Sequence, residues 1–229
     1  MKPLHTLAVT FDIELSPWEL TQFRGAVAAK VGLEHEWFHN HNNDTGGVHF
    51  RYPLIQYKID THDGKMRPML LCINEGVEAA NYLFRQDDWG MKIGNQTHDM
   101  PVYKIYQSEH CLQLVPQPLS YRIHKWKPFN TENFAHWQTI KGIAQQFAFL
   151  ERLLATHIIA FADSVEWQIP EQFEIIITKM IKDEIISHKS VKSLVFSLEF
   201  DTKVSLPNYI GLGKAVALGF GVIRRQRQT

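Results

Sequence analysis

The chain reads Pro207-Asn208-Tyr209-Ile210-Gly211-Leu212-Gly213-Lys214-Ala215-Val216-Ala217-Leu218-Gly219-Phe220-Gly221-Val222-Ile223-Arg224-Arg225 near the end of its 229 residues. Four of its 13 glycines stand here, in two Gly-apolar-Gly units separated by five residues that include Lys214. Glycine is favoured where the backbone has a positive φ or approaches another group closely. Backbone N–H groups beside a lysine form a concave site suited to phosphate. The stretch therefore predicts a glycine-rich loop that binds phosphate.

Two familiar phosphate-binding motifs do not fit this spacing. The dinucleotide fingerprint requires a glycine where the chain has Val216. The Walker A motif requires serine or threonine after the lysine, whereas Ala215 follows Lys214. The alternative without chemistry is a tight glycine hairpin.

The pattern resembles the C-terminal glycine-rich loop of the RAMP superfamily (repeat-associated mysterious proteins). Within it, the match is to CRISPR-associated endoribonucleases that cut repeat RNA into guide RNAs. Their signature is Gly-apolar-Gly, five residues with a basic one among them, and Gly-apolar-Gly again; residues 211–221 contain every element. The resemblance implies an α+β fold with two tandem ferredoxin-like (RRM-like) domains and a C-terminal glycine-rich loop.

The composition fits a globular protein, with 45% hydrophobic and 21% charged residues. The formal net charge of zero excludes a protein covered in positive charge, although a local basic groove suffices for RNA. Cys72 and Cys111 match no metal-ligand spacing and indicate a reducing compartment. No apolar run reaches the length of a membrane-spanning helix. We therefore expect a cytoplasmic protein without a membrane partner.

Hydrophobic periodicity predicts the elements of two domains. The first half contains a strand at 5–15, a helix at 17–30, strands at 48–59 and 65–73, a helix at 75–84 with Asn74 as its cap, and an extended region at 101–115. This order is ferredoxin-like. The second half contains a strand at 119–126, a long helix at 131–158, strands at 173–186 (a helix being the rival) and 191–200, and a short strand at 222–223. Pro116-Gln117-Pro118 predicts a boundary between domains 1–117 and 118–229.

Three histidines crowd into His35-Glu36-Trp37-Phe38-His39-Asn40-His41. His35, Glu36 and His39 formally match the His-Glu-x-x-His zinc motif, in which the histidines lie one helical turn apart. The preceding helix is expected to end near Gly32 and no third ligand motif follows, although His41 could complete a three-histidine site. A zinc hydrolase therefore remains an alternative.

The second interpretation of this segment is RNA cleavage without metal or cofactor. Attack of a 2′-hydroxyl on the adjacent phosphate requires a base, an acid and nearby positive charge, and histidine can fill either proton role. Phe38-His39-Asn40-His41 and the following residues 51–58 resemble one branch of the family. The resemblance implies His41 first and His39 second as catalytic residues. Lys30 and Tyr52 are further catalytic candidates, and Lys58 is a candidate RNA contact.

Basic and aromatic residues are interleaved in Tyr121-Arg122-Ile123-His124-Lys125-Trp126-Lys127. Lysine and arginine contact phosphates, and aromatic rings stack on unpaired bases. The alternative is a half-buried strand with solvated lysines. The predicted RNA-binding residues are Gly211, Gly213, Lys214, Gly219, Gly221, Lys58, Arg122, Lys125, Arg224 and Arg225.

These features predict a metal-independent endoribonuclease that cuts CRISPR precursor RNA within each repeat. The alternative from another class is a non-catalytic RAMP subunit that holds guide RNA in an effector complex and tolerates loss of His39 and His41. The resemblance implies CRISPR repeat RNA as a partner. It also allows other CRISPR effector subunits and a homodimer.

Overall fold

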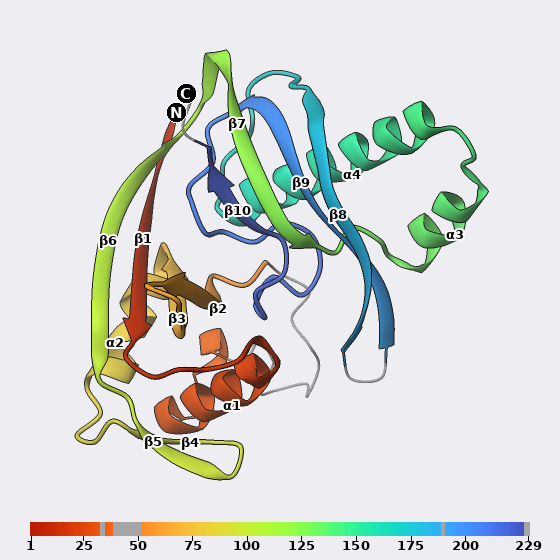
Figure 1. Ribbon diagram of the computed structural model, residues 1–229. Helices are drawn as coiled ribbons and strands as arrows, with labels where there is room; N and C mark the ends of the chain where they lie inside the picture. The colour runs from red at the N-terminus through yellow and green to blue at the C-terminus, as the bar shows by residue number, and fades with distance from the viewer. Residues whose placement is uncertain (33–34, 39–51, 189–190, 227–229) are drawn as a thin grey trace. The chain divides into compact units, whose positions relative to one another are not determined.

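The computed structural model describes residues 1–32, 35–38, 52–188 and 191–226 (Figure 1). The chain divides into two compact units. The N-terminal unit contains Leu4–His110 together with Ala217–Gly219, and the C-terminal unit contains Met1–Pro3, Cys111–Val216 and Phe220–Thr229. Three residues of the glycine-rich stretch therefore pack with the N-terminal unit.

The N-terminal unit is a four-stranded antiparallel sheet with two helices. Its elements are β1 (Lys2–Phe11), η1 (Pro17–Glu19), α1 (Leu20–Val31), η2 (Glu36–Phe38), β2 (Ile55–His62), β3 (Lys65–Ile73), α2 (Glu75–Phe84), β4 (Gly90–Ile93), β5 (Gln96–Asp99) and β6 (Val102–Leu112). The sheet order is β2-β3-β1-β6, while β4 and β5 form a separate hairpin that the sequence did not predict. This strand order is the ferredoxin-like topology. A buried cluster that includes Phe11, Phe23 and Leu70 forms its core.

The C-terminal unit repeats the same strand order. Its elements are β7 (Leu114–Trp126), α3 (Thr131–Thr139), α4 (Ile143–Ser164), β8 (Ile175–His188), β9 (Val191–Val204) and β10 (Val222–Arg225). The sheet order β10-β7-β9-β8 matches that of the first unit. Between β9 and β10, where a ferredoxin-like fold has its second helix, residues 205–221 contain no helix. The predicted α+β class with two ferredoxin-like halves is confirmed.

The single long helix predicted over 131–158 is wrong, because α3 and α4 are separate helices (Figure 1). Ile140 and Gly142 between them have extended backbone, with ψ of 117° and 131°. Glycine lowers helix stability and often stands at a helix boundary. Trp137 of α3 packs against other aromatic rings: its ring centre lies 5.3 Å from that of Phe129 and 5.6 Å from that of Phe196.

Asn74 does not cap α2 through its side chain, contrary to prediction. Its φ of 46° is outside the usual range for an N-cap, and its Oδ1 accepts a hydrogen bond from the His5 backbone N at 3.1 Å. The side chain thus ties the start of α2 to β1, while the bounds of α2 agree with the predicted 75–84.

The prolines expected to mark a domain boundary lie inside β7. Pairing of β7 with β9 shifts register between Leu114 and Leu119, and Pro116 and Pro118 fall in that irregular stretch. Proline lacks the N–H needed for a regular ladder, so a strand tolerates it at such irregularities. The two compact units change over between His110 and Cys111, and the domain bounds 1–117 and 118–229 stay a prediction.

Candidate nucleic-acid interface

The glycine loop, defined as residues 209–221, turns through several left-handed backbone positions. Gly213, Gly219 and Gly221 have φ of 91°, 78° and 65°. Gly211 is required for a different reason, since a Cβ there would lie 2.6 Å from the Cβ of Val216. The backbone conformation and packing of the loop therefore account for all four glycines. Direct contact of individual glycines with RNA stays a prediction.

Backbone hydrogen bonds hold the loop against the end of β7. The N–H of Lys214 donates to the carbonyl of Lys127 at 3.0 Å, and that of Gly221 donates to the carbonyl of Lys125 at 3.1 Å. A Cβ on Gly213 would lie 2.8 Å from the Lys127 carbonyl oxygen. Two stretches that the sequence identified separately, 121–127 and 207–225, are thus adjacent in the fold.

Lys127 and Lys214 form the electropositive part of this junction. Partial burial and the positive charge of Lys214 lower the pKa of Lys127. Among the described residues, neither lysine forms an ion pair with a carboxylate. Two neighbouring ammonium groups without a counter-charge suit a phosphodiester. Lys127 was within the predicted basic stretch but was not itself predicted to bind RNA.

His157 of α4 supports the same junction from inside the C-terminal unit. The Trp126 indole Nε1 donates a hydrogen bond to its Nδ1 at 3.2 Å, and the two rings are perpendicular. Burial, followed by the charge of Lys214, lowers the pKa of His157 to about 4. His157 is therefore neutral at pH 7, as an acceptor for an indole must be. Sequence reasoning missed it, because one histidine on an apolar helix face gives no signal.

Arginines of two adjacent strands lie beside the loop. Arg122 of β7 and Arg224 of β10 are register partners. Arg122 already forms an ion pair with Glu199, its Nη2 lying 2.6 Å from Oε1. The guanidinium of Arg224 lies 4.3 Å above the ring centre of Tyr209. The structure thus groups these arginines with Lys214 in the C-terminal unit, although both make protein contacts.

Lys125 and Arg225, the other two basic residues of the C-terminal unit that were predicted to bind RNA, also form hydrogen bonds within the protein. Lys125 has φ of 46° and lies at a β-bulge of β7, where its N–H donates to Ser197 Oγ at 3.0 Å. The N–H of Arg225 donates to Asn208 Oδ1 at 2.7 Å. These bonds involve the backbone of both residues, and contact of their side chains with RNA stays a prediction.

Lys58 of β2 is buried within the N-terminal unit, with 1% of its surface exposed. Its Nζ has no hydrogen-bond partner among the described residues, and burial lowers its pKa to about 7. Residues 217–219 lie alongside β2: the N–H of Tyr57 donates to the Ala217 carbonyl at 3.0 Å. A Cβ on Gly219 would lie 3.9 Å from the Cα of Lys58. Gly219 and Lys58 are therefore brought together, but Lys58 is not the solvated cation that a strand surface would present.

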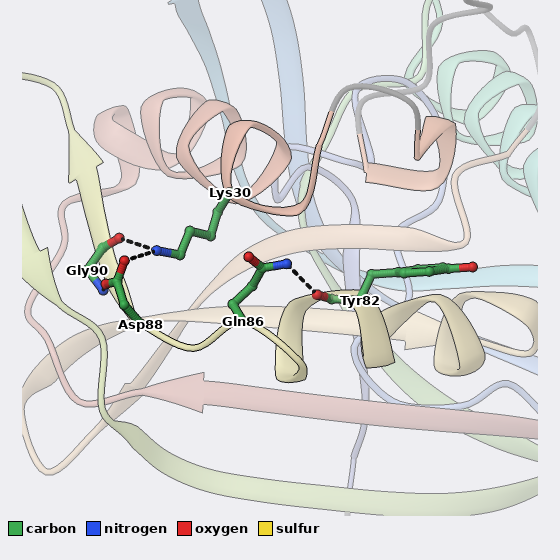
Figure 2. A network of polar contacts seen from close by, with 5 residues as sticks. All are labelled: Lys30, Tyr82, Gln86, Asp88 and Gly90. Carbon is green, nitrogen blue, oxygen red and sulfur yellow. Dashed lines mark hydrogen bonds and ion pairs between the residues drawn. The ribbon is translucent and has the colours of Figure 1, made fainter.

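The predicted catalytic residues are only partly placed. His41 and His39 lie outside the described residues. Tyr52 is half-buried in the segment that leads into β2. Lys30 lies in the last turn of α1, where its Nζ donates to Asp88 Oδ2 at 2.6 Å and to the Gly90 carbonyl at 3.1 Å (Figure 2). Hydrogen bonds from Lys30 and from the Gly90 N–H lower the pKa of Asp88.

These contacts give Lys30 a structural role, because they join α1 to the segment that enters β4. Figure 2 shows its side chain directed at Asp88 and Gly90, while Gln86 bonds the carbonyl of Tyr82. A catalytic role for Lys30 stays a prediction.

The described part of the zinc motif, His35 to Phe38, is not in an α-helix, and His39 lies outside the described residues. Glu36–Phe38 form a single 3-10 turn, and His35 precedes it. The His35 ring stacks on Tyr82 with 3.8 Å between ring centres. Within the described ranges, no three His, Cys, Asp or Glu side chains are grouped as metal ligands.

Two ferredoxin-like units, the second with a glycine loop in place of its second helix, are the architecture expected of a RAMP protein. A family model of the Cas6b N-terminal domain matches residues 2–111, and one of the Cas6b C-terminal domain matches residues 113–226. The chain belongs to the Cas6b family.

Solved structures share this fold over nearly the whole chain. A crystal structure of Cas6b is 23% identical, covers 98% of this chain and 100% of its own, and superposes with a TM-score of 0.87. A second, of the CRISPR RNA processing endoribonuclease Cas6b, is 19% identical with the same coverage and a TM-score of 0.73. An uncharacterized protein of Methanocaldococcus jannaschii is 24% identical over 103 residues, which is 45% of this chain and 69% of the relative.

No helix in the described ranges is long and apolar enough to span a membrane.

The neutral state of His157 predicts a stability change with pH. Its folded-state pKa of about 4 lies below the ordinary 6.5, so protons favour the unfolded chain. The stability that neutral His157 contributes to the folded state is complete above pH 6.5 and is lost as the pH falls toward 4. Thermal unfolding from pH 7 to 4 should therefore show a smaller decrease in Tm for His157→Gln than for the parent. His136→Gln, at an exposed site on α3, is the control, and parallel profiles for all three proteins would contradict the role of His157.

Proposed function

We propose that this Cas6b-family protein is an endoribonuclease that cuts CRISPR precursor RNA within its repeats, in the cytoplasm and without a metal ion. The observation that carries the proposal is the glycine loop fixed to the end of β7, with Lys127 and Lys214 beside it and no carboxylate paired with either in the described residues. The name of a similar structure, a CRISPR RNA processing endoribonuclease, supports the substrate class.

The loop and its two lysines bind the RNA backbone in this proposal. Phosphate contacts from lysine give affinity without reading sequence. Lys127 Nζ also lies 6.0 Å from the ring centre of Phe220, which offers a face on which a base can stack. Arg122, Lys125, Arg224 and Arg225 extend the positive surface along β7 and β10. The substrate is then a single-stranded or locally opened stretch of repeat RNA.

Cleavage proceeds by transfer of the phosphodiester bond within the RNA. A base removes the proton of the 2′-hydroxyl, and the 2′-oxygen bonds to phosphorus. The bond from phosphorus to the 5′-oxygen breaks, and an acid protonates that oxygen. The products are a 2′,3′-cyclic phosphate and a 5′-hydroxyl, and no water is consumed. His41 and His39 serve as the acid and base, with Tyr52 as a further candidate.

Lys58 supplies a cation to the bound RNA. Its burial without a hydrogen-bond partner in the part of the chain that the structure describes costs stability, because an ammonium group is strongly hydrated in the unfolded chain. A phosphate group nearby would offset that cost and raise its pKa again. Functional sites often lower the stability of the protein without its ligand, and binding of a charged ligand then offsets that cost.

A cleavage assay tests the proposed reaction. Repeat RNA is incubated with the protein in excess EDTA, beside a substrate with a 2′-deoxy sugar at the cut site. We expect cutting of the normal RNA and none of the deoxy substrate, because the attacking hydroxyl is missing. His41→Ala should lower the rate by about 10²-fold or more, the size of a general acid or base effect.

His136→Ala is the matched control and should cut at the parental rate. Cutting that EDTA abolishes would contradict a metal-independent reaction. RNA binding without cutting would instead support the alternative function, a non-catalytic subunit that holds guide RNA in an effector complex.

Substitution of Lys58 should separate stability from RNA binding. Lys58→Met replaces a buried ammonium with an apolar side chain of similar size, so thermal unfolding should shift upward. Parental RNA affinity should increase as the pH falls through about 7, because binding favours the charged lysine. Lys58→Met should bind more weakly and lose this pH dependence, as measured by fluorescence anisotropy between pH 6 and 8.

Lys92→Met, at an exposed position of β4, provides the control for removing one positive charge. Unchanged RNA affinity and pH dependence in Lys58→Met would contradict the proposed role of Lys58.

A further inference from the structure

Tyr57 of β2 is bonded to two segments that the proposed function uses. Its backbone N–H donates to the Ala217 carbonyl at 3.0 Å, and its side-chain hydroxyl donates to the Phe38 carbonyl, also at 3.0 Å. Ala217 belongs to the glycine loop, and Phe38 immediately precedes His39 in the sequence. Tyr57, Phe38 and Ala217 all belong to the N-terminal compact unit. A single residue of the sheet therefore joins the glycine loop to the start of the histidine segment, residues 39–41.

The bond from the Tyr57 hydroxyl lies inside the core. The side chains of Tyr57 and Phe38 are both buried, and both residues belong to the same hydrophobic cluster. The Tyr57 ring also packs edge-on against Phe23, with 5.7 Å between ring centres. Phe38 is thus held in two ways, by the packing of its side chain and by the hydrogen bond to its carbonyl.

The packing of this core does not by itself require a hydroxyl at position 57. A phenylalanine would fill almost the same volume with no polar atom, whereas a buried hydroxyl costs free energy unless it is hydrogen-bonded. Here the hydroxyl bonds the backbone of a residue 19 positions earlier in the chain. Its specific contribution is therefore to fix the position of Phe38 relative to β2.

The Tyr57 phenol is a permanent hydrogen-bond donor. Burial raises its pKa above the ordinary value, and the nearby positive charge of Arg24 offsets only part of that effect. The phenol consequently stays protonated at neutral pH and does not exchange protons with a substrate. A contribution of Tyr57 to cleavage must come from where it holds the chain.

We propose that Tyr57 is a positioning residue for RNA cleavage: its hydroxyl fixes the chain at Phe38, where the histidine segment begins, relative to the glycine loop that its backbone holds. The inference rests on the proposed function, in which His41 and His39 transfer the protons. A general acid or base must lie within hydrogen-bond reach of the atom that it protonates or deprotonates. A displacement of about 1 Å can lower a rate by about 10²-fold. Tyr57 acts through Phe38 and not on the RNA.

Tyr57→Phe separates positioning from RNA binding, because it removes the hydroxyl and keeps the backbone N–H that bonds Ala217. We expect parental affinity for repeat RNA, measured by fluorescence anisotropy with the uncleavable 2′-deoxy substrate. The single-turnover cleavage rate should fall by about tenfold. Because the phenol does not titrate, this factor should be the same at every pH from 6 to 8.

Thr6→Val is the matched control for loss of a buried hydroxyl from the N-terminal sheet. The Thr6 hydroxyl hydrogen-bonds Ser108 Oγ at 2.9 Å, and valine has nearly the same shape as threonine. Both variants should have a lower Tm, and all proteins are assayed at a temperature where each is folded by circular dichroism. Thr6→Val should cut at the parental rate. An equal loss of rate in Thr6→Val would overturn the positioning role, because reduced stability alone would then explain the effect of Tyr57→Phe.

A double-mutant cycle with His41→Ala tests whether the hydroxyl acts through the histidine segment. Residues that act as a unit have non-additive effects on rate. In the His41→Ala protein, Tyr57→Phe should therefore lower the remaining rate by about twofold or less. A tenfold loss in both backgrounds would overturn the proposed coupling.

The outcomes distinguish this inference from the proposed function. A parental protein that binds repeat RNA without cutting it would overturn the proposed reaction, and the role of Tyr57 with it. A parental protein that cuts, beside a Tyr57→Phe variant with the parental rate, would overturn the role of Tyr57 alone. Loss of RNA affinity in Tyr57→Phe equal to its loss of rate would also overturn that role.

Discussion

The hydrogen bonds between the glycine loop and the end of β7 are the constraint on which the site depends. The carbonyl of Lys125 accepts a hydrogen bond from the N–H of Gly221, and the carbonyl of Lys127 accepts one from the N–H of Lys214. These bonds hold the loop in left-handed conformations that include Ala215, with φ of 57°. A non-glycine residue in such a conformation costs about 1–2 kcal/mol, which surrounding interactions must offset. The loop is thus a defined backbone shape, and Lys127 and Lys214 become neighbours because of it.

Several features of the protein lower stability and are best understood through ligand binding. Lys127 and Lys214 repel each other, and Lys58 is buried without a hydrogen-bond partner among the described residues. An anion would relieve both costs. His157, which accepts a hydrogen bond from Trp126, is neutral at pH 7 and adds no further positive charge near Lys127 and Lys214. In the proposed function, a polyanionic ligand such as RNA offsets the cost of these charges.

Sequence periodicity predicted the α+β class and the order of elements in the first half, whereas the pair of ferredoxin-like units was what the family resemblance implied. The bounds of β3 and α2 agree with the predicted 65–73 and 75–84. Tertiary context decided the rest: the helix break before Gly142 and the prolines inside β7 depend on partners that periodicity does not reveal. The glycine motif predicted a loop, but its contact with residues 125–127 links positions far apart in sequence. Burial of Lys58 was missed because a lysine in a strand usually indicates a solvated face.

Comparison of two glycine variants tests the central claim most directly. A Cβ at Gly221, where φ is 65°, would overlap the carbonyl of Leu212, whereas a Cβ at Gly25 in α1 meets nothing within 4 Å. Repeat-RNA affinity is measured for Gly221→Ala and Gly25→Ala at a temperature where both are folded by circular dichroism. The account predicts that Gly221→Ala loses about tenfold or more in affinity while Gly25→Ala binds like the parent. Parental affinity in Gly221→Ala would contradict the claim that the shape of the loop forms the RNA site.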